Sequence, residues 1–268
     1  INMQSQLLGL AIGVAIGIAL HVVRVSSWKK ASLYLYFATL VMLALVVAIG
    51  VEANGAQRWL LIGGIQVQPS ELAKVVMIGF LAQIVSVGRL RANSFMTVVK
   101  SIAIVGAPIG LVMLQPDLGS AIVFVIIWAT ILFNSKLQLS RFSFMVMAII
   151  AGALVLTPFL AEYQQARLIS YFNADSDLSG ANYNVEQAKI AIGNGGVLGN
   201  GLEGGSQSQL NFLPSQHTDF IYAVTAEKLG LLGAGAVLVA FACMYMRMIY
   251  IAWQIENEFE GLVIVGIV

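Results

Sequence analysis

The sequence predicts an all-α membrane protein that crosses the bilayer several times. Hydrophobic residues make up 59% of its 268 residues and charged residues only 10%, whereas a soluble domain carries roughly a quarter charged residues. Eight apolar segments alternate with short loops, and one polar loop, at residues 162–218, is far longer than the others. We therefore expect one membrane domain over residues 1–268, built as a helical bundle that displays one large loop.

The apolar runs have the length that a spanning helix needs, about 20 mostly apolar residues. They lie near residues 7–23, 32–51, 70–87, 98–114, 119–134, 142–161 and 219–251, and an eighth begins at Gly261. Because the chain opens on Ile1 rather than Met and stops inside an apolar run, we expect it to be part of a longer protein. The single cysteine, Cys243, lies inside a run, so we expect it to pack there rather than to bind a metal or form a disulfide.

Charge predicts the orientation of these helices. Alternate loops hold nine of the 14 basic residues: Arg24, Lys29, Lys30, Arg89, Arg91, Lys100, Lys136, Arg141 and Arg247. Short cytoplasmic loops carry such an excess of Lys and Arg. Ten of the 13 acidic residues fall in the intervening loops and helix mouths, so these loops, including the long one, should face the outside.

Two outward turns place a proline and then a carboxylate at the start of a helix. Pro69 suits the first helical position, and Glu71 falls in the first turn, where the helix dipole favours an acid. Glu71 and Lys74 are three residues apart and can pair on one face, either as a simple ion pair or as the wall of a polar cavity. Asp117 also follows a proline, and it could cap the next helix or contact a substrate.

Arg58 and Trp59 lie upstream on the outer side. We assign Trp59 to the aromatic belt at the membrane interface. The planar guanidinium of Arg58 is well suited to a phosphate or pyrophosphate, although a surface salt bridge would use it equally well.

The long loop contains two segments with a recognisable sequence pattern. Residues Tyr183 to Ile192 read as an amphipathic helix that could lie along the membrane surface. A run of glycines follows at 193–205, and glycine allows positive φ and close approach of the backbone. These glycines lack the context of a Walker or Rossmann motif, so we exclude a nucleotide and expect a tight turn over a cavity.

The loop ends at His217, Thr218 and Asp219, immediately before a nearly uninterrupted apolar run. Thr218 or Asp219 could simply cap the helix that follows. The Asp219 carboxylate could equally be a general base or bind a divalent cation through oxygen, with His217 orienting it or lying at the interface.

Six segments, in this order, resemble the signatures of the SEDS family (shape, elongation, division and sporulation), and together they span nearly the whole chain. They are Gly55-Ala-Gln-Arg-Trp, Gln68-Pro-Ser-Glu-Leu-Ala-Lys, Gln115-Pro-Asp-Leu-Gly, Tyr163-Gln-Gln-Ala-Arg167, Ala191-Ile-Gly-Asn-Gly-Gly196 and the run from Leu210 to Phe220. The stretch from Gln207 to Pro214 resembles the elongation branch of the family more than the division branch.

The resemblance implies a ten-helix membrane fold, of which about eight helices are present and the first, most of the ninth and the tenth lie outside this chain. It implies that lipid II is polymerised into β-1,4 glycan strands at the outer face of the bacterial cytoplasmic membrane, with inversion. Asp219 matches the position of the catalytic aspartate and would act as general base. Glu71 and Lys74 match a pair in the central cavity and would support it.

Other residues would help to bind the substrate. Arg58, Lys74, Arg167 or a divalent cation, Mg²⁺ or Mn²⁺, would stabilise the leaving diphosphate. Asp117, His217, Thr218 and Glu227 are further candidates for substrate binding or support. The chain departs from the family pattern at Glu227-Lys228, where the family usually has two acids.

The resemblance also implies the partners: lipid II, the nascent lipid-linked glycan, membrane lipid and a class B penicillin-binding protein that supplies the transpeptidase. We expect no nucleic acid and no nucleotide or organic cofactor. Alternatives are a division enzyme with the same chemistry, a lipid II flippase and a scaffold for other wall enzymes. The charged residues cluster at the outward mouths rather than at the midplane where transporters bind, which favours the enzyme.

Overall fold

The computed structural model describes residues 3–22, 25–53, 56–62, 65–86, 95–135, 143, 146–147, 181–201, 204–205, 207, 212, 216 and 218–268. The chain forms two compact units. The smaller unit comprises Ile1–Ala11 and Glu162–Arg247, and the larger unit comprises Ile12–Ala161 and Met248–Val268. Most of the predicted span at 142–161 lies outside the described residues, as do Arg167 and His217, and the expectation of a single membrane domain stays a prediction.

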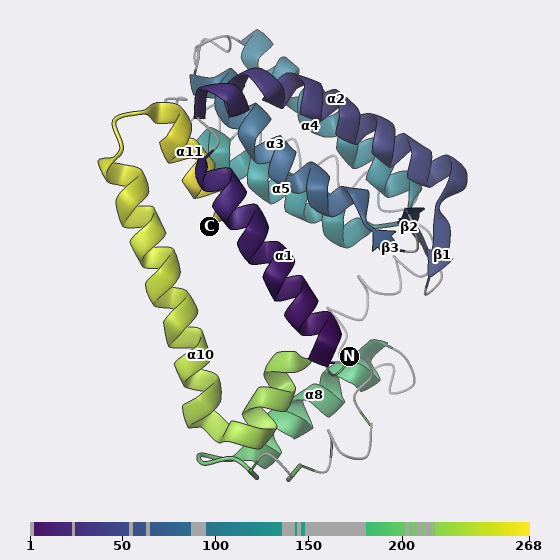
Figure 1. Ribbon diagram of the computed structural model, residues 1–268, viewed down its shortest axis with the longest axis vertical. Coiled ribbons are helices and arrows are strands. Elements are labelled where there is room, and N and C mark those ends of the chain that lie inside the picture. The colour runs from purple at the N-terminus through teal and green to yellow at the C-terminus, as the bar shows by residue number, and fades with distance from the viewer. Residues whose placement is uncertain are drawn as a thin grey trace. The chain divides into compact units, whose positions relative to one another are not determined.

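The larger unit is a helical bundle (Figure 1). Its complete helices are α2 (Val25–Ile49), α3 (Pro69–Ser86), α4 (Phe95–Leu114), α5 (Leu118–Phe133) and α11 (Glu258–Ile267). Helix α3 is the central element of this bundle, because it contacts α2, α4, α5 and α11. The two remaining long helices, α1 (Met3–Val22) and α10 (Ile221–Gln254), each belong partly to both units.

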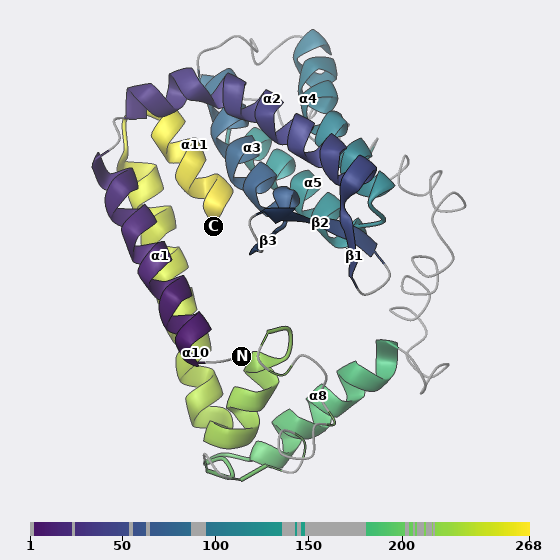
Figure 2. The ribbon, with the colours of Figure 1, turned by 45° about the vertical axis from the view of Figure 1, so that its right-hand side comes forward.

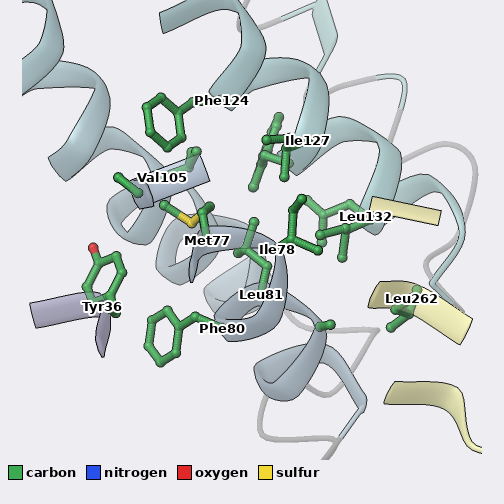
Figure 3. Packing of buried hydrophobic residues seen from close by; sticks show 14 of the residues in the cluster. Tyr36, Met77, Ile78, Phe80, Leu81, Val105, Phe124, Ile127, Leu132 and Leu262 are labelled. Carbon is green, nitrogen blue, oxygen red and sulfur yellow. The ribbon is translucent and has the colours of Figure 1, made fainter. Parts of the chain in front are cut away.

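The core of the larger unit lies between α3 and the helices around it (Figure 3). Met77 and Leu81 of α3 and Phe124 and Ile131 of α5 are fully buried there. The ring of Tyr36 on α2 stacks on a phenylalanine of α3, with 4.5 Å between centroids, and its hydroxyl donates a 2.8 Å hydrogen bond to a backbone carbonyl of α4. Lipid is as apolar as these side chains, so close packing and such hydrogen bonds hold the helices together more than the hydrophobic effect does.

The helices confirm the predicted class of multi-span helical membrane protein. Within the described residues, three helical segments are long and apolar enough to cross a membrane: Ser27–Ile49, Pro69–Ser86 and Ile221–Gln254. Helix α2 begins seven residues before the predicted span, and the additional turns contain Lys29 and Lys30. Long basic side chains can lay their stems along apolar surface, so the two lysines do not end the helix.

A small antiparallel sheet was not predicted. It has the strand order β1 (Val51–Ala53), β2 (Ala56–Ile62) and β3 (Ile65–Val67). Val51 pairs with Trp59, and Leu60 pairs with Val67. The Gly-Gly dipeptide at 63–64 is a hairpin signal in the sequence, but so short a segment between two apolar runs predicts only a connection between helices. The sheet matters because β2 carries Arg58 and β3 leads into α3.

In the smaller unit, helix α8 (Ala181–Gly195) lies beside the first turns of α10, as both ribbon views show (Figures 1 and 2). This helix confirms the predicted amphipathic segment at 183–192. Ala191 is fully buried against α10, whereas Val185 and Ile190 are exposed. An ion pair between Lys189 and Glu186, 2.6 Å long, lies on its exposed face.

The packing of α2 on α3 depends on the absence of a side chain at Gly79. A Cβ atom there would lie 2.5 Å from the indole nitrogen of Trp28, whereas a Cβ at Gly110 of α4 would meet nothing within 4 Å. We therefore expect Gly79→Ala to lower the free energy of unfolding by about 1–3 kcal/mol through overpacking. Gly110→Ala should be neutral or slightly stabilising, because alanine favours a helix. Thermal unfolding of the detergent-solubilised protein checks this, and equal melting temperatures for the two variants would contradict it.

Candidate functional site

The larger unit gathers polar groups around the carboxylate of Asp117, which is only 6% exposed. Asp117 is the N-cap of α5: its Oδ1 accepts from the Ser120 backbone N–H at 3.2 Å, and its Oδ2 accepts from the Ser120 hydroxyl at 2.8 Å. The side chain of Gln68 donates to Oδ2 at 3.4 Å. Capping, one of the two predicted roles, is therefore what the structure shows, while direct contact with a substrate stays a prediction.

Arg58 joins this network from β2. Its Nη2 donates to the carbonyl of Pro116 at 2.7 Å, and its Nη1 lies 3.7 Å from Oδ1 of Asp117. The salt-bridge interpretation of Arg58 is thus confirmed, and the partner is a half-buried network rather than the open surface. The guanidinium Nε is buried without a protein partner, and 27% of the side chain remains exposed. Contact between Arg58 and a phosphate stays a prediction.

The predicted pair at the start of α3 also forms. Lys74 Nζ lies 2.8 Å from the carboxylate of Glu71, with the lysine side chain 20% exposed and the glutamate 57% exposed. An ion pair that water reaches contributes about 0–1 kcal/mol to stability. The pair therefore adds little to stability, and its main effect is to place two opposite charges at this end of α3. Its supporting role in a cavity stays a prediction.

In the smaller unit, a glycine turn follows α8. Gly196, Gly199 and Gly201 all have positive φ, between 52° and 82°, which side chains rarely tolerate. This confirms the predicted turn, whereas the cavity beneath it stays a prediction. The turn packs against α10, because a Cβ on Gly199 would lie 2.2 Å from the carbonyl oxygen of Lys228.

Helix α10 is broken where the glycine turn meets it. Gly230 has φ 67° and ψ −168°, so the run Ile221–Gln254 consists of two helical pieces. Glu227 lies in the first piece and is fully buried, and its Oε1 accepts a hydrogen bond from the backbone N–H of Gln207 at 2.9 Å. Neither the break nor the Gln207 partner was predicted, since each depends on contacts between distant segments.

Thr218 and Asp219 form a turn directly before α10, and both are exposed. Asp219 therefore presents its carboxylate at the helix N-terminus, where the helix dipole favours a negative charge. The role of Asp219 as a general base stays a prediction. His217, the proposed orienting residue, lies outside the described residues, so its predicted role is untested.

The described residues offer a metal ion few ligands. Among them, no group of three or more His, Cys, Asp or Glu side chains comes together. Mg²⁺ is commonly held by one or two carboxylates together with substrate phosphates and water. The Asp219 carboxylate suits this arrangement as a single oxygen ligand.

Comparison with known proteins connects these features to a family. The family model for FtsW, RodA and SpoVE, described as a cell cycle protein, matches residues 1–268. The chain is 35% identical over 268 residues to the peptidoglycan glycosyltransferase MrdB of Escherichia coli K12, covering 99% of this chain and 72% of the relative. It is also 35% identical over 255 residues to a probable peptidoglycan glycosyltransferase FtsW of Coxiella burnetii, covering 94% of this chain and 68% of the relative.

Solved structures resemble the chain as well. A peptidoglycan synthase complex, described by its coordination of polymerization and crosslinking, contains a chain with a TM-score of 0.80 and 26% identity, covering 97% of this chain and 73% of that one. The rod shape determining protein RodA of Thermus thermophilus has a TM-score of 0.67 at 23% identity, covering 98% of this chain and 69% of that one, and this likeness supports the fold alone.

Asp117 caps α5 and pairs with Arg58, and substitutions can separate these two roles. Asp117→Ala removes the N-cap of α5 and leaves Arg58 without its carboxylate, so we expect the free energy of unfolding to fall by about 1–2 kcal/mol. Asp117→Asn keeps an oxygen that accepts from Ser120 and should lose less than half as much, because asparagine caps as well as aspartate. Glu186→Gln, which breaks the exposed pair on α8, is the matched control and should change little. Thermal unfolding in detergent measures all three, and equal losses for the two Asp117 variants would contradict the capping role.

Proposed function

Because this chain belongs to the FtsW, RodA and SpoVE family of cell cycle proteins, we propose that it is a peptidoglycan glycosyltransferase that polymerises lipid II into β-1,4 glycan strands. One observation carries the proposal, namely the similarity along the whole chain to a peptidoglycan glycosyltransferase. The helical membrane fold agrees with a substrate whose lipid tail stays in the bilayer. We assign the enzyme to the elongation branch, which builds the wall of rod-shaped cells.

In the proposed mechanism, Asp219 acts as the general base. The acceptor is the 4-hydroxyl of an N-acetylglucosamine, which is a poor nucleophile at neutral pH. The Asp219 carboxylate takes the hydroxyl proton while the hydroxyl oxygen attacks the anomeric carbon of the donor. The bond from that carbon to the diphosphate breaks on the opposite face, so an α-linked donor gives a β-linked product. The exposed position of Asp219 before α10 supports this role, because a general base must be accessible to the hydroxyl group that it deprotonates.

The leaving diphosphate needs positive charge as its own negative charge develops. Arg58, Lys74 and Arg167 are the proposed sources within the chain. Arg58 and Lys74 are held by Asp117 and Glu71, so each is already oriented and would add a phosphate contact to its protein contact. A divalent cation, Mg²⁺ or Mn²⁺, is a further proposed source, with Asp219 as one oxygen ligand.

The proposed setting is the bacterial cytoplasmic membrane, with the catalytic side outward. The distribution of basic residues supports this orientation, since short cytoplasmic loops carry the excess of Lys and Arg. A class B penicillin-binding protein is the proposed partner, because a glycan strand strengthens the wall only after its peptides are crosslinked. The similarity to a chain of a peptidoglycan synthase complex supports such a pairing.

There are two alternatives to the proposed function. A division enzyme would use the same chemistry, and the 35% identity to an FtsW protein equals that to MrdB, so overall identity does not separate the branches. A lipid II flippase would move the precursor without chemistry. The exposed carboxylate at Asp219 favours the enzyme, because it lies at a helix end rather than at the midplane where transporters bind.

The first test is polymerisation of lipid II by the purified full-length protein with its cognate penicillin-binding protein. We expect Asp219→Ala and Asp219→Asn to lower the rate of strand formation by about 10²–10⁴-fold, because each removes the proton acceptor. Gel analysis of labelled glycan strands measures the rate, and Glu186→Gln on the exposed face of α8 serves as the active control.

Other results would redirect the assignment. Normal polymerisation by both Asp219 variants would make Asp219 a helix cap and place the base elsewhere. A wild-type protein that forms no polymer, yet moves lipid II across liposomes, would favour the flippase.

The proposed cation has its own test. If a divalent ion offsets charge on the diphosphate, a chelator should abolish polymerisation, and added Mg²⁺ or Mn²⁺ should restore it. The thermal unfolding midpoint should stay unchanged, since the described residues do not build a closed metal site. Full activity in excess chelator would exclude the cation.

A further inference from the structure

The break in α10 leaves backbone groups that a second segment satisfies. In a membrane-embedded region, polar backbone groups need partners within the protein. The carbonyls of residues 227 and 228 accept from the N–H groups of Asn200 and Gly201, each at 3.0 Å. Beyond the break, the N–H groups of Leu231 and Leu232 donate to the carbonyls of residues 196 and 197, at 2.9 and 3.2 Å. The glycine turn therefore completes the hydrogen bonds that Gly230 interrupts.

The two segments meet backbone to backbone, which fixes their register. A Cβ on Gly195 would lie 2.0 Å from the carbonyl oxygen of Ala226. A Cβ on Gly230 would lie 2.3 Å from the nitrogen of Gly199. Atoms this close cannot make room for a side chain, so the turn and the helix hold one position relative to each other.

Glu227 extends this contact toward the end of the long loop. Its side chain is fully buried, and burial of a carboxylate is costly unless the group is hydrogen-bonded. It accepts from the backbone N–H of Gln207 at 2.9 Å, across 20 residues of sequence. Asp219 lies within the stretch whose two ends this bond joins.

We infer that Glu227 is a positioning residue, which joins the long loop to the broken helix and thereby sets where Asp219 stands. The expected effect of Glu227 on the rate rests on the proposed function. The contact between Glu227 and Gln207 rests on the structure alone. It also accounts for the departure from the family pattern at Lys228. The glycine turn uses the backbone carbonyls of Glu227 and Lys228, which any residue supplies, whereas Gln207 uses the side chain of Glu227.

Substitution at Glu227 tests the inference in the full-length protein with its partner. Glu227→Ala removes the acceptor, and we expect kcat for lipid II polymerisation to fall by about 10–100-fold, because a small misplacement of a catalytic group has an effect of this size. KM for lipid II should change by less than about threefold, since the Glu227 side chain is fully buried. Glu227→Gln keeps an oxygen for the Gln207 N–H and should restore at least a third of wild-type kcat.

A second pair of variants removes the donor instead. Gln207→Pro deletes the N–H group that Glu227 binds, and Gln207→Ala keeps it. We expect Gln207→Pro to resemble Glu227→Ala, and Gln207→Ala to resemble Glu227→Gln. This pair keeps the inference testable if Glu227→Ala fails to fold. Glu186→Gln is again the active control.

Hydrogen exchange of peptides covering 207–221 gives a readout that needs no activity. Faster exchange in Glu227→Ala, with wild-type exchange in Glu227→Gln, is the expected result. Unchanged exchange and kcat in Glu227→Ala and Gln207→Pro would overturn the inference. Loss of activity in Glu227→Gln at wild-type exchange would overturn it too, because the charge rather than the contact would then matter. If the wild type makes no polymer, the proposed function fails, and exchange alone decides whether the contact holds the loop.

Discussion

The need to satisfy every buried backbone group within the protein governs this structure more than any other constraint. The interior of an unbroken helix meets the need by itself, and a cap such as Asp117 on α5 meets it at the end. Helix α10 does not, because Gly230 interrupts its hydrogen bonds. The glycine turn supplies the missing partners, and this requirement brings the long loop into a fixed register with a membrane helix. The residue that we assign as the base stands at the start of that helix.

The same requirement, that a buried polar group needs a partner within the protein, explains two buried acids. Asp117 accepts from the first turn of α5, and Glu227 accepts from the backbone of Gln207. Each carboxylate therefore joins a helix to a neighbouring segment, which makes its burial acceptable. Asp219 differs from both because it is exposed. The buried acids hold segments together, whereas the exposed acid is free to accept a proton in the proposed reaction. This difference follows from the surroundings of each carboxylate rather than from its residue type.

Sequence reasoning succeeded where the information is local. Apolar runs marked the helices, and a spacing of three residues marked the pair of Glu71 with Lys74. A carboxylate after a proline at a helix start gave the cap at Asp117 as one of two possible roles. It missed the contact of Arg58 with the turn before α5, because the partners are 58 residues apart. It also missed the break at Gly230, since a glycine in an apolar run is common and only the distant glycine turn gives it a purpose. The catalytic assignment of Asp219 came from family resemblance, not from spacing.

The pairing of the glycine turn with α10 has a consequence for how the protein is made. Residues 196–201 leave the ribosome before α10 does, and only about 30 residues separate the paired segments. The partner of the broken helix is thus already synthesised when α10 enters the bilayer. Contacts between segments close in sequence form early. The contact between the glycine turn and α10 can therefore form during synthesis, before α11 is made.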